Sequence, residues 1–322
     1  ASKLALSGFC RLGGELLATA TWTLDAGDGL DDYWVAATSE GEIIAYKGTD
    51  PSSASTWAMI GIWRVGKPLS RRCFQKFGGD VLILCDDGVW PLSVLLATER
   101  TAQNKSVSYK IVDAIRKDAN SYRDKFGWQL LFWPREQMLL VNVPVATGSQ
   151  QKQWAMNTIN RGWGYFTGVE ANCFETYQGN LYFGGDGFVS RFWNTFADDG
   201  AAITGNAKQA FNYFSTPMRK QFVMARPILS TNGAPSVAFG VNTDFSDDDN
   251  LPAVSISPTG YGVWDTATWD GAIWGGGLNV NRNWVNVSGL GFCAAARLKV
   301  QSTGIETHWQ STDILYKRGS PL

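Results

Sequence analysis

The chain has 322 residues, of which 44% are apolar and 18% are charged, and its formal net charge is −1. This length suffices for a large hydrophobic core divided between two or three packed units. No run of basic residues stands out, which disfavours electrostatic binding of nucleic acid or of an anionic membrane. The 35 glycines and 15 tryptophans are typical of aromatic strands separated by glycine turns, so we expect an all-β protein.

The predicted strands follow one another at short intervals. Residues 33–38 and 42–46 flank a short Ser-Glu-Gly turn and predict a hairpin. Residues 81–84 are apolar on both faces, which indicates a central strand. Other segments that read as strand material are residues 4–6, 9–12, 57–65, 73–77 and 89–92.

A segment of the chain is duplicated. Residues 73–83 (CFQKFGGDVLI) return as residues 173–183 (CFETYQGNLYF). The flanks match as well, because each copy follows a Trp-Ala-Met and precedes an Asp-Gly turn, at residues 57–59, 87–88, 154–156 and 186–187. Strand, turn and strand therefore recur in the same order.

Duplicated antiparallel modules point to a β-propeller or a related repeat architecture. We expect repeats at about residues 31–93 and 126–193, within a repeat region that spans residues 1–200. Each repeat offers roughly six strands, which suits one and a half four-stranded blades. Beyond residue 200 the repeat signature ends, and residues 201–322 predict a separate C-terminal β domain, either a sandwich or a further propeller portion.

One amphipathic helix is expected between the repeats, at about residues 105–124. Its apolar stripe is open to two interpretations: it packs on its own propeller, or it packs on a neighbouring subunit. The apolar residues recur at three- and four-residue spacing, as Val107, Ile111, Ala114, Ile115, Ala119 and Tyr122.

The five cysteines are scattered, and we expect them to be reduced core residues. No apolar stretch of eighteen residues and no signal-peptide pattern occurs, which favours folding in a cytoplasm and no membrane segment. The chain starts with Ala1 rather than Met, so we expect residues upstream of it. The cysteines are Cys10, Cys73, Cys85, Cys173 and Cys293.

Candidate chemistry is sparse, and the sequence predicts no catalytic residue, cofactor or metal site. The single histidine, His308, reads as a surface or satisfied strand residue rather than as part of a triad or a metal cage. The acidic loops at residues 25–32 and 247–249 could take Ca²⁺ but lack EF-hand spacing, so solvated loops are favoured. A propeller glycosidase would need paired carboxylates, and the acids to consider are Asp32, Asp80, Asp186 and Asp265.

Three tryptophans in the C-terminal region are candidate contact residues. Trp264, Trp269 and Trp274 stand at five-residue steps, which fit neither one strand face nor one helix face, so we expect them on successive turns. Their rings could stack on sugars while Asp265 and Asp270 accept hydrogen bonds, as in a carbohydrate-binding tail receptor. Core or interface tryptophans are the more common alternative.

Several segments together resemble a family of tailed-bacteriophage virion structural proteins. The resemblance covers most of the chain and implies a β-propeller component similar to the nozzle or tail-hub proteins of short-tailed phages. The segments that carry it are residues 20–32 (ATWTLDAGDGLDD), 41–57 (GEIIAYKGTDPSSASTW), 71–93, 138–144 (MLLVNVP) and 264–270 (WDTATWD).

What the resemblance implies is a structural role without catalytic residues. Such proteins form a ring, usually sixfold, beneath the portal and adaptor, and they line the channel through which genomic DNA leaves. The expected partners are further copies of the chain, the portal and adaptor, and spike or fibre proteins. The expected location is the virion tail, after assembly in the host cytoplasm. A carbohydrate-binding module and a propeller glycosidase are the alternatives.

Overall fold

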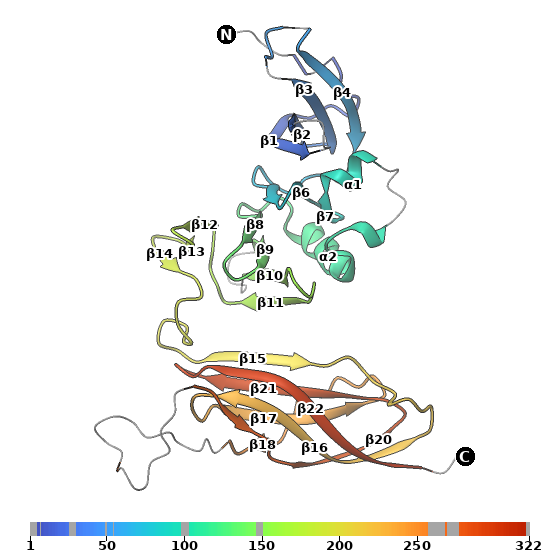
Figure 1. Cartoon of the computed structure of the whole chain (residues 1–322), viewed down its shortest axis with the longest axis vertical. Coiled ribbons are helices and arrows are strands. Elements are labelled where there is room, and N and C mark those ends of the chain that lie inside the picture. The colour runs from blue at the N-terminus through green and yellow to red at the C-terminus, as the bar shows by residue number, and fades with distance from the viewer. Residues whose placement is uncertain are drawn as a thin grey trace. The chain divides into compact units, whose positions relative to one another are not determined.

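The chain divides into two compact units, Ala1–Phe192 and Trp193–Leu322, close to the predicted boundary at residue 200 (Figure 1). Both units are built mainly from antiparallel strands, which confirms the all-β fold class. The structure, a computed structural model, describes residues 5–6, 8–25, 30–48, 50–53, 55–97, 103–145, 151–256, 268 and 277–319.

In the described part of the first unit, four small antiparallel sheets follow one another along the chain, each a meander of consecutive strands. Sheet A consists of β1 (Leu16–Asp25), β2 (Leu30–Thr38), β3 (Glu42–Gly48) and β4 (Trp57–Arg64). Sheet B consists of β5 (Phe74–Phe77), β6 (Asp80–Cys85) and β7 (Gly88–Pro91). Sheet C consists of β8 (Gln129–Trp133), β9 (Met138–Val143), β10 (Lys152–Asn157) and β11 (Trp163–Thr167). Sheet D consists of β12 (Cys173–Tyr177), β13 (Asn180–Gly184) and β14 (Val189–Arg191).

The sequence repeat corresponds to one four-stranded sheet followed by one three-stranded sheet. The two matching segments form the hairpins β5–β6 and β12–β13, and each Asp-Gly turn leads into the third strand of its sheet. The hairpin β2–β3 and the central position of β6 are also as predicted. Each repeat thus holds seven strands rather than six, and the first begins at β1, before residue 31.

The Trp-Ala-Met match is not structurally equivalent, so this part of the predicted repeat is wrong. Residues 57–59 lie on β4, the last strand of sheet A, whereas residues 154–156 lie on β10, the third strand of sheet C. Strand order, rather than this motif, relates sheet A to sheet C: both are four-stranded meanders that precede a three-stranded sheet.

The N-terminal segment corrects a second prediction, because residues 9–12 form turns and bends rather than a strand. Their backbone is held by a side chain instead of a neighbouring strand. The buried carboxylate of Glu42 accepts hydrogen bonds from the backbone N–H groups of Arg11 and Leu12, each at 3.0 Å. A carboxylate that satisfies successive N–H groups favours a curved backbone over an extended one.

A short helix replaces the end of the strand predicted at residues 89–92. Strand β7 ends at Pro91, which cannot donate to a further ladder, and α1 (Leu92–Ala97) begins at the next residue. The carboxylate of Asp80 accepts hydrogen bonds from the backbone N–H and the hydroxyl of Ser93. Asp80 therefore satisfies a donor in the first turn of α1.

The predicted amphipathic helix is present over Val112–Tyr122, shorter than the predicted 105–124, and it packs on its own chain. Two 3₁₀ turns, η1 (Gln103–Lys105) and η2 (Tyr109–Ile111), precede α2 (Val112–Tyr122). Ile115 and Ala119 are buried in the core of the first unit. The buried carboxylate of Asp118 accepts hydrogen bonds from Lys152 Nζ at 3.0 Å and Trp154 Nε1 at 2.8 Å, which ties α2 to β10. In the described parts of the chain, no helix is long and apolar enough to cross a membrane.

The sheets pack face to face because apolar side chains alternate between the two faces of each strand. In sheet C, Leu139 and Val141 enter the core shared with sheets A and B and with α2, whereas Leu131 and Leu140 enter the core shared with sheet D. Every residue of β6 from Val81 to Cys85 is buried. Sheets B and C are thus covered on both faces, as internal blades of a propeller-like stack are, and sheets A and D are its terminal members.

The second unit is a β-sandwich, the first of the two folds predicted for this region. One sheet has the order β15 (Ile203–Lys208), β21 (Ala294–Ser302), β17 (Ser236–Thr243) and β18 (Ala253–Val254). In the other, β16 (Lys220–Thr231) pairs with β22 (Thr307–Arg318) on one side and with β19 (Asn279–Asn281) and β20 (Val285–Gly291) on the other. Leu229, Phe239 and Leu298 lie in the core between the sheets.

We expect Ile115→Ala to lower the free energy of unfolding of the chain by about 2–5 kcal/mol, because it leaves a cavity under α2. Urea unfolding followed by tryptophan fluorescence measures the loss. Lys117→Ala, at an exposed position of the same helix, is the matched control and should change the value by less than about 0.5 kcal/mol. Equal effects of the two substitutions would contradict the packing of α2 on its own unit.

Candidate functional site

Part of the predicted site falls outside the described residues. Trp264, Trp269 and Trp274 lie there together with Asp265, as does the side chain of Asp32, whose backbone belongs to β2. Asp80 is bound to the first turn of α1, and Asp186 is exposed in the turn between β13 and β14. The described residues thus bring no two of these four acids together as a pair.

The remaining candidate groups occupy structural positions. His308 lies on β22, half-exposed as predicted, with its Nε2 2.7 Å from the carboxylate of Glu306. Among the residues that the structure describes, no group of three or more His, Cys, Asp or Glu side chains could hold a metal ion.

The acidic loop at residues 247–249 pairs with basic side chains of the sandwich. Arg297 donates to Asp247 at 2.7 Å and lies 2.6 Å from Asp249, while Lys208 and Lys299 complete the cluster at 2.8 and 2.5 Å. The hydrogen bond from Lys208 holds the pKa of Asp247 below its usual value, and the hydrogen bond from Lys299 does the same for Asp249. These carboxylates are already paired with cationic side chains. The cluster therefore fits a loop that ion pairs hold against the sandwich better than it fits the Ca²⁺ site considered from the sequence.

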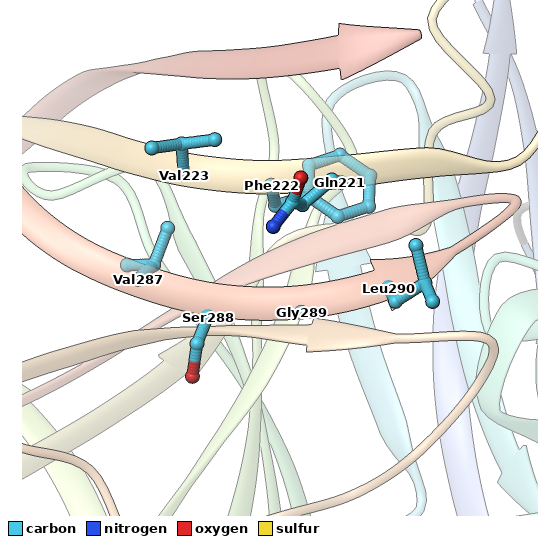
Figure 2. Close-up of a pocket in the computed structure, with 7 residues that line it drawn as sticks. All are labelled: Gln221, Phe222, Val223, Val287, Ser288, Gly289 and Leu290. Atoms are coloured by element: carbon cyan, nitrogen blue, oxygen red, sulfur yellow. The ribbon is translucent and has the colours of Figure 1, made fainter. Parts of the chain in front are cut away.

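A shallow depression of about 480 Å³ lies between β16 and β20 (Figure 2). The register of this strand pair shifts between Phe222 and Met224, which interrupts the ladder at this point. Gln221 and Ser288 are the polar side chains among the seven lining residues, and none of the seven is titratable. The lining residues are Gln221, Phe222, Val223, Val287, Ser288, Gly289 and Leu290.

The cysteines reveal a difference between the two repeats. Cys73, Cys85 and Cys293 are buried as predicted, but Cys173, the counterpart of Cys73, is exposed, so the prediction of a core residue is wrong there. Burial raises the pKa of the Cys73 thiol to about 12. Sheet B is covered on both faces, whereas sheet D, at the end of the stack, is covered on one.

The uncovered surface of sheet D, which we name the open face, is the best candidate for a functional site. Its residues follow from the ladder, because directly opposed residues share a face: Glu175 is opposite Tyr182, and Tyr182 is opposite Arg191. Tyr177 is 63% exposed and Val189 is 76% exposed. The open face consists of Cys173, Glu175, Tyr177, Asn180, Tyr182, Gly184, Val189 and Arg191.

Each position of the open face has a counterpart in sheet B. Val189 corresponds to Val89, which is fully buried, and Tyr182 corresponds to Leu82, which is also buried. Tyr177 corresponds to Phe77, whose ring packs edge-on against Phe132 of sheet C with centroids 4.9 Å apart. In sheet B this face is therefore the one that receives the next sheet of the stack.

Polar side chains fix how one sheet meets the next. Gln129 of sheet C accepts a hydrogen bond from the N–H of Phe174 and donates to its carbonyl oxygen, both at 2.8 Å. Asn142 donates to the carbonyl oxygens of Gly127 and Ala171 at 2.8 Å, and Gln153 donates to Asn142 and Val169 at 2.9 Å. These buried amides set the position of sheet D against sheet C, and thereby the direction of the open face.

The sequence contains a signal for this face that motif reasoning missed. Between the two copies, Phe77 changes to Tyr177, Leu82 to Tyr182 and Leu84 to Gly184. Leu82 and Leu84 are alternate residues of β6, and the ladder places Phe77 of β5 on the same face, because Phe77 is opposite Asp80. One face of the second copy is therefore more polar and less bulky than its counterpart in the first.

Comparisons with known proteins do not identify the chain. No protein-family model matches it, and no curated protein matches it. Among solved structures, a glycoside hydrolase family 43 arabinoxylan arabinofuranohydrolase from Bacillus subtilis, in complex with cellotetraose, aligns at 9% identity. The alignment covers 93% of this chain and 79% of the hydrolase, with a TM-score of 0.22, which is too low to transfer fold or activity.

We expect Cys173 to react rapidly with N-ethylmaleimide in the folded monomer and Cys73 to stay unmodified, because burial keeps the Cys73 thiol both inaccessible and protonated. Peptide mass spectrometry after a short pulse gives the modified fraction at each cysteine. Denatured chain is the control in which both must react. Similar rates at the two positions in the native chain would contradict the assignment of sheet D as a terminal sheet.

Arg297→Gln should raise the pKa values of both Asp247 and Asp249 toward the usual value, because both carboxylates lose a cationic neighbour. Lowered pKa values in the folded state mean that this stabilisation is present above the unfolded pKa and is lost as pH falls through the folded pKa. NMR titration of the carboxyl carbons measures both pKa values. Lys317→Gln, an exposed change on β22, should leave them unaltered, and unchanged values in Arg297→Gln would refute the pairing.

Proposed function

We propose that the chain is a structural subunit of a bacteriophage tail that assembles into a nozzle or hub ring around the DNA-ejection channel. The proposal combines the resemblance of residues 20–32, 41–57 and 71–93 to virion structural proteins with one structural observation. That observation is the open face of sheet D, where a stack of sheets ends on exposed aromatic and aliphatic side chains.

The composition of the open face suits assembly between proteins. Tyrosine and arginine are enriched at interfaces because they combine a large contact area with hydrogen-bonding groups. Tyr177, Tyr182 and Arg191 provide such groups, and Cys173 and Val189 lie beside them. A face of this kind tolerates water before assembly and still buries apolar area afterwards.

The charge distribution is compatible with a channel through which DNA passes. Each strong contact between a basic side chain and a phosphate would retain the DNA, because neutralising phosphates releases counterions and raises affinity. The net charge is −1, and several basic side chains of the second unit, among them Arg297, Lys208 and Lys299, are engaged by aspartates. A ring of such subunits would let DNA pass without binding it strongly.

In the proposed tail, the ring lies below the portal and adaptor, and spike or fibre proteins contact its periphery. Assembly takes place in the host cytoplasm and the mature location is the virion. The sandwich unit offers a second surface for these contacts, because β15 is an edge strand whose six residues are all exposed.

We expect purified chain to form closed rings, sixfold in cryo-electron microscopy classes and of corresponding mass in mass photometry. Tyr177→Asp with Val189→Asp should shift the population to monomer, raising the dissociation constant at least about 30-fold, because each change would bury an unpaired carboxylate. Tyr165→Asp is the matched control, since Tyr165 is 62% exposed but lies on β11, outside the open face.

The opposite outcome is also informative. A chain that remains monomeric at every concentration and binds polysaccharides on a glycan array would contradict the structural role. Loss of that binding in Trp269→Ala would then favour the carbohydrate-binding alternative, and loss of polysaccharide turnover in Asp80→Asn or Asp186→Asn would favour the glycosidase.

A further inference from the structure

We propose that the open face of sheet D binds the outer face of sheet A of a second copy, so that the stack of sheets continues from one subunit into the next. This inference rests on the proposed function, because it names the contact through which the ring forms. The outer face of sheet A is the surface that points away from sheet B. Its residues are Trp34, Ala36, Ile44, Tyr46, Trp57 and Ile62, together with Thr19 and Thr21 of β1.

The order of the repeat indicates which type of sheet follows sheet D. The stack alternates four-stranded and three-stranded sheets, in the order A, B, C, D. In sheet B, the face equivalent to the open face receives a four-stranded meander, sheet C. Among the residues that the structure describes, sheet A is the other four-stranded meander, and it too precedes a three-stranded sheet. A second copy therefore carries the kind of sheet that the open face is built to meet.

The contact between sheets B and C shows which strands would meet. It includes β5 and β8, because Phe77 packs on Phe132. Just before β5, the carbonyl oxygen of Arg72 accepts a hydrogen bond from the N–H of Leu130 at 3.2 Å. By strand order, β12 corresponds to β5, and β1 corresponds to β8. The contact between copies would then join Tyr177 of one copy to the outward residues of β1 of the next.

The proposed contact between copies differs from the contact between sheets B and C on both of its sides, and on both sides its residues are more polar. Tyr177 stands where sheet B has Phe77, and Thr19 and Thr21 are the outward residues of β1 where β8 carries Leu130 and Phe132. A contact that forms only on assembly must be wet in the free subunit, and hydroxyl groups lower the cost of that exposure. The paired change from aromatic and aliphatic to hydroxyl-bearing residues is what an intersubunit copy of the B–C contact requires.

The outer face of sheet A is apolar at its centre and accessible at β1. Trp34, Tyr46 and Trp57 form an aromatic cluster, with the rings of Tyr46 and Trp57 stacked at 5.5 Å. Leu6 and Cys10 of the N-terminal segment cover the middle of the face, where Ala36 and Ile44 are buried. Thr19 and Thr21 are exposed. The strand required for the contact with Tyr177 is thus the uncovered one.

Joining two different faces gives a head-to-tail interface, and this type of interface determines how many copies can assemble. Such a heterologous interface repeats from copy to copy and closes into a ring when the rotation between copies divides a full turn. An interface between two open faces would instead be isologous and would stop at a dimer. The proposal therefore predicts oligomers larger than two that are linked through Cys173 and sheet A.

The native thiol of Cys173 makes the contact testable by cross-linking in the full chain. In Thr21→Cys, a short bismaleimide should produce a ladder of covalent oligomers that extends beyond the dimer. Wild type, Thr21→Cys combined with Cys173→Ser, and Ser52→Cys, an exposed change in the loop before β4, are the matched controls and should give no ladder. In wild-type rings, Cys173 should be protected from N-ethylmaleimide at least about tenfold relative to the monomer.

Several results would overturn the proposal. A Cys173–Cys173 dimer in wild type without a ladder in Thr21→Cys would indicate an isologous contact. A cross-link within a single chain would mean that sheet A closes on sheet D of the same copy. Protection of Cys173 in the monomer would place another part of the same chain on the open face. Rings in which Cys173 stays reactive would refute this contact and leave the proposed function standing, whereas absence of rings would count against both.

Discussion

Sheet C carries apolar side chains on both faces, and the arrangement of the first unit depends on this alternation. Leu139 and Val141 on one face and Leu131 and Leu140 on the other require two covering layers, because either face left in water would expose a continuous apolar surface. Sheets A and B with α2 supply one layer, and sheet D supplies the other. The end sheets of such a stack have no further sheet against their outer faces, so these faces are left to solvent or to other covering segments.

Polar groups give the stack its geometry. Apolar burial is not directional, and sheets held by it alone could slide or rotate over one another. Gln129 and Asn142 remove that freedom between sheets C and D, because each satisfies backbone groups that would otherwise be buried without partners. Asp118 acts similarly under α2, through Lys152 and Trp154. The open face consequently has a fixed direction relative to the rest of its unit.

Repetition followed by divergence explains how one module can serve both as interior and as surface. Sheets B and D share a hairpin, yet Val89 is buried and Val189 is exposed. In the second copy, the exposed strand face carries tyrosines. Phe174 and Leu181 lie on the opposite face, where sheet C covers them. In the proposed tail subunit, such a face can contact water in the free subunit and can be buried against a neighbour when the ring forms.

The sequence by itself determined the all-β class, the duplicated hairpins, the central strand β6, the amphipathic helix and the C-terminal β domain, because period and turn chemistry act locally. It did not determine which copy of the repeat is covered on both faces. Cys73 and Cys173 have similar neighbours along the chain, and only the number of sheets stacked against them makes one buried and the other exposed.

The misplaced Trp-Ala-Met match and the missed α1 have the same origin. Short motifs recur on different strands, and Pro91 ends β7 where Asp80, from an adjacent strand, supplies the acceptor for Ser93. The open face was therefore decided by tertiary structure, since burial depends on contacts between segments far apart in the sequence.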